Sequence, residues 1–114
     1  MSTQAKADID ALLNELMIAT NSLDSKGREF AIKESEYRVV LRKALIVGRA
    51  EGYPVTILRD ICLGLDEVAN ARLMRDIAQA QYDAMKERIN TLKLHIRMLD
   101  EQIRRDFDLA GRVT

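Results

Sequence analysis

Apolar residues in the first half of the chain recur every seven positions, which is the pattern of a long amphipathic helix. The repeat runs without a slip through Ile9, Leu16, Leu23, Phe30, Tyr37 and Ala44. Such a repeat keeps its members on one side of a helix, where they can pack along a neighbouring helix. The pattern predicts a first helix over about residues 4–50.

One segment within this range, TNSLDSKG at residues 20–27, contains residues that favour turns and caps over helix interiors. The heptad repeat nevertheless passes from Leu23 to Phe30 in phase, which a helix that broke and restarted would do only by chance. We expect a continuous helix that is weakened or bent here, and a break is the alternative. Gly27 alternatively marks a close approach of another backbone.

Apolar residues in the second half alternate steps of three and four, which predicts a second long helix over about residues 66–109. The main row consists of Tyr82, Met85, Ile89, Leu92, Ile96, Leu99 and Ile103. The first part of this helix carries a second apolar row, formed by Ala69, Leu73, Ile77, Ala80 and Ala84. A helix that is apolar on two sides is expected to contact more than one neighbour.

The stretch EGYPVTILRD between the two helices holds the only proline of the chain. Gly52 can adopt the positive φ that ends a helix, and Pro54 suits the first turn of a new one. We predict a corner over residues 51–65 that contains a short helix. Two helices of similar length joined in this way are expected to fold back antiparallel.

This fold-back predicts a register in which paired residue numbers sum to about 116. Phe30 then lies near Lys86, and Glu34 has Tyr82 or Lys86 as its nearest polar partner. Charge agrees with the register, because acidic residues outnumber basic ones in residues 6–24 and basic residues outnumber acidic ones in residues 86–105. Exposed ion pairs are individually weak, so these charges select orientation rather than hold the fold together.

The chain has 114 residues, which is enough for one domain, so we expect a single helical-hairpin domain over residues 1–114. A two-helix hairpin shields each apolar row from one side only, which leaves little apolar area to offset the entropy of folding. The expected fold is therefore all-α: a long antiparallel, coiled-coil-like helical hairpin with a short helix at the corner, dimerising into a four-helix bundle. The candidate oligomer interface is the second apolar row, Ala69, Leu73, Ile77, Ala80 and Ala84.

Composition limits the cellular compartments and the classes of partner that fit this chain. Eighteen basic and eighteen acidic residues cancel, so no global field attracts nucleic acid or an anionic membrane. A single cysteine excludes an intrachain disulfide, and no apolar run has the length of a signal peptide or a membrane span. We expect a cytoplasmic protein without a membrane partner.

Catalytic and metal-binding patterns are scarce. Cys62 lies on the apolar face of the corner helix, where a thiol is more often a small buried hydrophobe than a nucleophile. His95 is the only histidine, and no Glu-x-x-His pair supplies the ligands of a helical-bundle metal site. No glycine-rich phosphate loop occurs either. We expect no enzyme, no metal and no cofactor.

Contact surfaces are the remaining candidates for function. The candidate partner surface comprises Tyr53, Ile57, Leu58, Lys86, Arg88, Lys93, Arg97 and Arg104. The basic members can instead follow a phosphate backbone, which makes a DNA- or RNA-binding accessory the main alternative. Residues 58–73 faintly match a helix-turn-helix, but the spacing is about two residues too short.

The run from Gly48 to Ile103, with YPVTILRDIC as its most specific piece, resembles small uncharacterised helical proteins of phages and prophages of Gram-positive bacteria. The resemblance covers most of the chain and contains no motif that defines an activity. It implies an accessory protein in the bacterial host that contacts a phage replication or recombination factor or a host protein, such as one of host defence. Together with the dimer expected from the hairpin, this suggests a homo-oligomeric adaptor that acts through protein–protein contacts. A secreted helical hairpin of the WXG type is a further alternative, although the Trp-x-Gly turn is absent.

Overall fold

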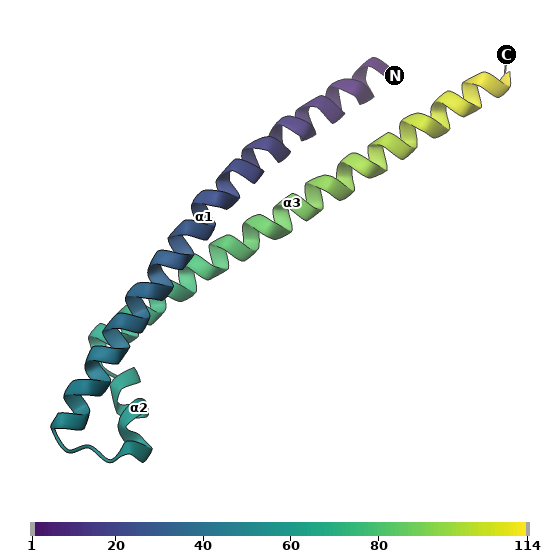
Figure 1. Cartoon of the computed structure of the whole chain (residues 1–114). Coiled ribbons are helices and arrows are strands. Elements are labelled where there is room, and N and C mark those ends of the chain that lie inside the picture. The colour runs from purple at the N-terminus through teal and green to yellow at the C-terminus, as the bar shows by residue number, and fades with distance from the viewer. Residues whose placement is uncertain (1, 114) are drawn as a thin grey trace. The chain divides into compact units, whose positions relative to one another are not determined.

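The computed structural model describes residues 2–113, and these residues form three helices in the order α1 (Ser2–Ala50), α2 (Val55–Leu63) and α3 (Asp66–Val113) (Figure 1). The described residues contain no strand, so the predicted all-α class is confirmed. They divide into two compact units. The terminal unit comprises the described residues up to Asp24 and from Ala84 onward, and the corner unit is Ser25–Asp83.

Helix α1 is continuous through residues 20–27, as the in-phase heptad repeat predicts. The Thr20 hydroxyl donates a hydrogen bond of 2.8 Å to the carbonyl of Leu16, so this polar side chain is accommodated within the helix. Gly27 does mark a close approach, but of a ring rather than a backbone. A Cβ at Gly27 would lie 3.1 Å from Tyr82 Cε1, and Tyr82 stacks on Phe30 with ring centroids 6.1 Å apart.

The corner forms where the sequence predicts it. Gly52 has a φ of 93°, which an L side chain rarely adopts. Pro54 occupies the N-cap position of α2 rather than its first turn, and its carbonyl accepts hydrogen bonds from the amides of Ile57 and Leu58. Helix α2 then packs against the end of α1, because a Cβ at Gly48 would lie only 2.6 Å from Leu58 Cδ1.

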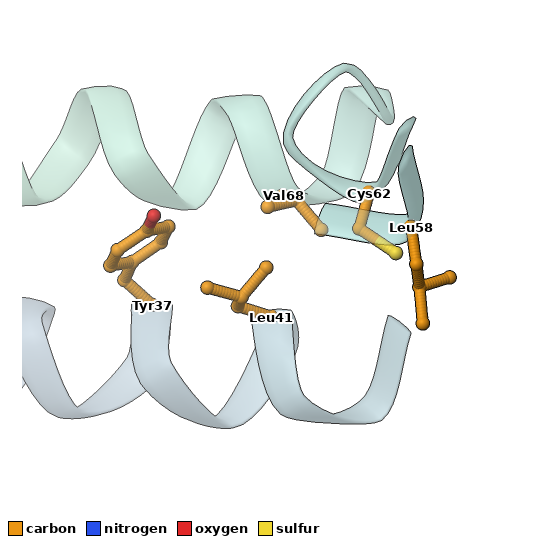
Figure 2. Packing of buried hydrophobic residues seen from close by; sticks show 5 residues of the cluster. All are labelled: Tyr37, Leu41, Leu58, Cys62 and Val68. Atoms are coloured by element: carbon orange, nitrogen blue, oxygen red, sulfur yellow. The ribbon is translucent and has the colours of Figure 1, made fainter. Parts of the chain in front are cut away.

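The core of the corner unit draws on all three helices. Tyr37 and Leu41 point from α1 towards the opposing helix, and Val68 and Cys62 point into the same space from the other side (Figure 2). Val68 and Cys62 are 1% and 2% exposed. Three helices therefore enclose this core.

The core of the terminal unit draws on two helices. Ala19 from α1 packs with Ile89 and Leu92 from α3, and the half-buried residues around them are Leu12, Leu16, Leu23 and Met85. Within each unit α1 and α3 run antiparallel, as predicted. In the terminal unit Ala19 packs with Ile89, whereas the earlier Asp8 lines a pocket together with the later Ile103. In the corner unit Phe30 stacks on Tyr82, whereas the later Leu41 packs with the earlier Val68.

The predicted register is wrong by one to two helical turns in the corner unit. Glu34 binds Arg75 rather than Tyr82, and Phe30 stacks on Tyr82 rather than lying beside Lys86. The sequence-based register assumed that α3 starts opposite the end of α1. In the structure α2 packs against the last turns of α1 at Gly48, so the start of α3 lies opposite Leu41 instead.

Candidate interaction surfaces

The second apolar row of α3 is exposed. In the corner unit it consists of Ala69, Leu73, Ile77 and Ala80, and the two large side chains, Leu73 and Ile77, are 53% and 44% exposed. Ala84 is likewise exposed, in the terminal unit. We call the four residues of the corner unit the outer row.

The opposite side of α3 faces the corner core. It carries Val68, Ala71 and Ala78, which are buried or half-buried. A helix turns by about 100° per residue, so these positions lie on the side of α3 away from Leu73 and Ile77. This segment of α3 is therefore apolar on two sides, and the outer row is exposed in the single chain. The expectation that the outer row contacts a further neighbour stays a prediction.

A second apolar surface lies at the corner. Tyr53 and Ile57 are 42% and 46% exposed, as a partner surface requires. Tyr53, but not Ile57, lines a pocket of about 360 Å³ that opens between the end of α1, the short helix and the start of α3; its lining also includes Val47 and Leu65. We call this the corner groove.

Leu58 does not belong to a partner surface, and its assignment there is wrong. Its side chain is 7% exposed and packs into the corner core against Gly48. The apolar face of α2 was read from its periodicity alone, which cannot distinguish a face that meets α1 from one that meets another protein. Leu58 stabilises the corner instead.

The basic residues assigned to a partner surface, Lys86, Arg88, Lys93, Arg97 and Arg104, are all exposed on α3 in the terminal unit. Their spacing places Lys86, Lys93, Arg97 and Arg104 along one side of the helix, whereas Arg88, two positions after Lys86, projects from another. Arg88 lies 3.6 Å from Glu15, and Arg104 lies 3.2 Å from Asp100. The five residues therefore do not form one continuous basic face.

Glu34 is the centre of a charged network in the corner unit. Its carboxylate accepts hydrogen bonds from Arg38 Nε at 2.8 Å and from Arg75 Nη1 at 2.9 Å. The pKa of Glu34 is lowered mainly by the hydrogen bond from Arg38 and, to a smaller extent, by the hydrogen bond from Arg75. The carboxylate therefore stays ionised at a lower pH than that of an ordinary glutamate. Arg75 also donates to Asp76 at 2.7 Å, and its guanidinium lies 4.7 Å from the centroid of the Tyr37 ring.

A pocket of about 470 Å³ adjoins this network, and its lining includes Arg59 and Arg72. Sequence analysis missed these residues because they come from different helices and share no spacing. The only signal in the sequence was the presence of several arginines between residues 59 and 75. That signal could have indicated a shared pocket only if the register of the helices had been known.

The remaining chemical candidates, Cys62 and His95, belong to different units. Cys62 is a buried free thiol in the corner unit, and His95 is exposed in the terminal unit. Within residues 2–113 no group of histidine, cysteine and acidic side chains has the arrangement of a metal site. Over the same range, none of the helices combines the length and the apolar character of a membrane span.

Comparisons with protein-family models, with curated proteins and with solved structures found no match to this chain. Functional interpretation therefore depends on the geometry of the surfaces described above.

Proposed function

We propose that this protein is a homo-oligomeric helical adaptor that acts through protein–protein contacts. The observation that carries the proposal is the outer row, because it leaves Leu73 and Ile77 about half exposed on the side of α3 that faces away from the core. Contiguous exposed apolar side chains of this kind mark interaction sites on soluble proteins.

A second copy of the chain is the occupant that the outer row fits best. If two α3 helices pack antiparallel about an axis near Ile77, Leu73 of each copy lies opposite Ala80 of the other. Each large side chain then meets a small one, which allows the close interdigitation of packed helices. Because the outer row faces away from α1, such a two-fold arrangement places the two α3 segments in the middle and an α1 segment on the outer side of each. The proposed dimer is therefore a layer of four helical segments rather than a bundle around one shared core.

The corner groove is the proposed contact for a different protein. Tyr53 supplies an aromatic anchor, which is enriched among residues that dominate binding energy. Following the resemblance to phage and prophage proteins, we propose a phage replication or recombination factor, or a host protein, as the partner in the bacterial cytoplasm. The groove lies at the corner, whereas the outer row runs along α3, so both contacts can form on one chain.

The mass in solution tests the oligomer. We expect sedimentation equilibrium to give about twice the 13.0 kDa mass of one chain for the wild type. The double substitution Leu73→Lys and Ile77→Lys places two charges in the proposed interface, so it should convert the protein to a monomer. Circular dichroism should show that the monomer remains helical, because both side chains are exposed in the single chain.

Leu109→Lys is the matched control, because Leu109 is also an exposed apolar residue of α3 and lies outside the outer row. It should leave the dimer intact. A wild type that is monomeric at all accessible concentrations contradicts the proposal, and so does a double variant that remains dimeric.

A further inference from the structure

The pocket of about 470 Å³ in the corner unit is lined by all three helices and concentrates positive charge. Its charged lining consists of Glu34 and Arg38 from α1, Arg59 from α2, and Arg72 and Arg75 from α3. Four guanidinium groups thus face a single carboxylate, although the whole chain has a formal net charge of zero. A concave surface lined by one sign of charge focuses its field on an incoming ion of the opposite sign.

The four arginines differ in how far their charges are already compensated. Arg38 and Arg75 both donate to Glu34, and Arg75 donates in addition to Asp76. Arg59 and Arg72, by contrast, take part in no hydrogen bond or ion pair with any described residue. Two guanidinium groups on different helices therefore remain to bind a ligand from outside.

Arg75, which lines the pocket beside Arg59 and Arg72, is fixed by its contacts. The side chain of Arg75 is 20% exposed, and its position is defined by Glu34, by Asp76 and by the ring of Tyr37. The ring of Tyr37 belongs to the buried core, and its hydroxyl points towards α3 (Figure 2). Groups that are ordered before binding lose less entropy when a ligand arrives.

We propose that this pocket binds the phosphoryl group of a small phosphorylated molecule, with Arg59 and Arg72 as its direct ligands. A phosphate monoester carries close to two negative charges near neutral pH, which matches the two uncompensated guanidinium groups. The arginine fork also donates two parallel hydrogen bonds to phosphate oxygens. The pocket volume lies in the range of small-molecule sites, so it has room for more than the phosphoryl group itself.

Carboxylate ligands fit the pocket less well. A carboxylate group has two oxygens, which one guanidinium fork occupies, whereas a phosphoryl group has three and can meet both arginines at once. Citrate therefore serves as a probe that matches the phosphorylated molecules in charge but not in this geometry. Glu34 already supplies the carboxylate that Arg38 and Arg75 bind. The inference is independent of the proposed oligomer, because every residue of the pocket comes from one chain.

Isothermal titration calorimetry of the full chain with inorganic pyrophosphate, with ATP and with citrate tests the proposal. Both phosphorylated probes should bind, and citrate should bind at least about tenfold more weakly. If ATP binds more tightly than pyrophosphate, the natural ligand includes a nucleoside. If the two bind equally, the phosphoryl group alone is recognised. Citrate that binds as tightly as pyrophosphate overturns the phosphoryl assignment.

Variants localise the site. Arg59→Ala and Arg72→Ala should each weaken pyrophosphate binding by about tenfold or more, because each removes a charge-assisted contact. Arg59→Lys should retain part of the affinity, since it keeps the charge but loses the fork. Arg49→Ala is the matched control, because Arg49 is an exposed arginine at the end of α1 outside the pocket.

All three substituted positions are exposed, so the variants should fold, which circular dichroism verifies. A wild type that binds neither phosphorylated probe contradicts the proposal. An Arg49→Ala variant that loses as much affinity as the Arg59 and Arg72 variants contradicts it equally, because binding would then reflect general charge.

Discussion

The corner unit encloses its core between three helices, whereas the terminal unit has only two helices to do so. In the corner unit Val68 and Cys62 are almost completely buried, and the Glu34 network adds oriented hydrogen bonds at its edge. In the terminal unit Ala19, Ile89 and Leu92 are buried at 3%, 7% and 6% exposed, and only α1 and α3 contribute to this core. Both units expose large apolar side chains on their outer sides, such as Met98 in the terminal unit and Leu73 in the corner unit. Two helices cover each other along one side only.

The difference shows why a short helix of nine residues matters so much. Helix α2 supplies Leu58 and Cys62 to the core and thereby adds the third wall that the long helices lack. A core with three walls excludes water without help from another molecule, whereas a helix pair gains stability from any partner that covers its outer sides. We therefore expect the corner unit to be the more stable part of an isolated chain.

Truncation of one buried leucine in each core tests this comparison, and it has the largest expected effect on stability. Leu58→Ala should lower the free energy of unfolding by about 2–5 kcal/mol, the usual range for a buried leucine. Leu92→Ala should cost about 1 kcal/mol less, because two helices can close over the gap more easily than three connected ones. Urea denaturation at equal protein concentration, followed by circular dichroism, measures both.

Ile57→Ala is the control for the corner, because Ile57 is the exposed neighbour of Leu58 on α2. Its effect should stay below about 1 kcal/mol. If Leu92→Ala proves as costly as Leu58→Ala, the two units are equally well packed and the comparison fails.

The packing of α2 against Gly48 of α1 provides a second test of the comparison between the two units. Gly48→Ala gains up to about 1 kcal/mol of helix propensity, but the new methyl group meets Leu58 Cδ1 at 2.6 Å within the core. Overpacking of this kind costs about 1–3 kcal/mol, so we expect a net loss of about 1 kcal/mol. Thermal unfolding of the single variants and of the Gly48→Ala, Leu58→Ala double variant measures the coupling.

Gly111→Ala gives the reference for helix propensity alone, since a Cβ there meets nothing within 4 Å. It should leave stability unchanged or raise it slightly. The close contact between α2 and Gly48 is refuted if the Gly48→Ala protein is as stable as the Gly111→Ala protein. It is also refuted if the stability loss of the double variant equals the sum of the losses of the two single variants.

The Glu34 network gives the smallest expected effect, and it depends on pH. The pKa of Glu34 is lowered in the folded chain, so its contribution to stability is complete above the unfolded value of about 4.3 and is lost as the pH falls through the lower folded value. Glu34→Gln should therefore have a lower melting temperature than the wild type at pH 7, and the two should converge in acid. A series of melting curves from pH 7 to strongly acidic pH tests this.

Glu36→Gln is the matched control on the same helix, where Glu36 pairs with Lys33 three residues earlier. It should shift the melting temperature less than Glu34→Gln does. A difference between wild type and Glu34→Gln that is independent of pH would show that the amide perturbs packing rather than charge.

Sequence periodicity predicted the three helices and the two apolar sides of α3 because these features depend on neighbours three and four residues apart. It failed for Leu58 and for the partner of Glu34, because both depend on where α2 lies. It also missed the pocket with Arg59 and Arg72, since no local pattern relates residues of two different helices.

The amino-acid sequence by itself determined the helical class, the residue ranges of the helices along the chain and the turn at Gly52 and Pro54. These features depend on backbone preferences and apolar spacing, which act locally. Only the tertiary structure decided the register of α1 against α3 within the corner unit, and with it the contact between Glu34 and Arg75. The physical reason is the close approach of α2 to Gly48, which occupies the last turns of α1 and moves the start of α3 towards Leu41.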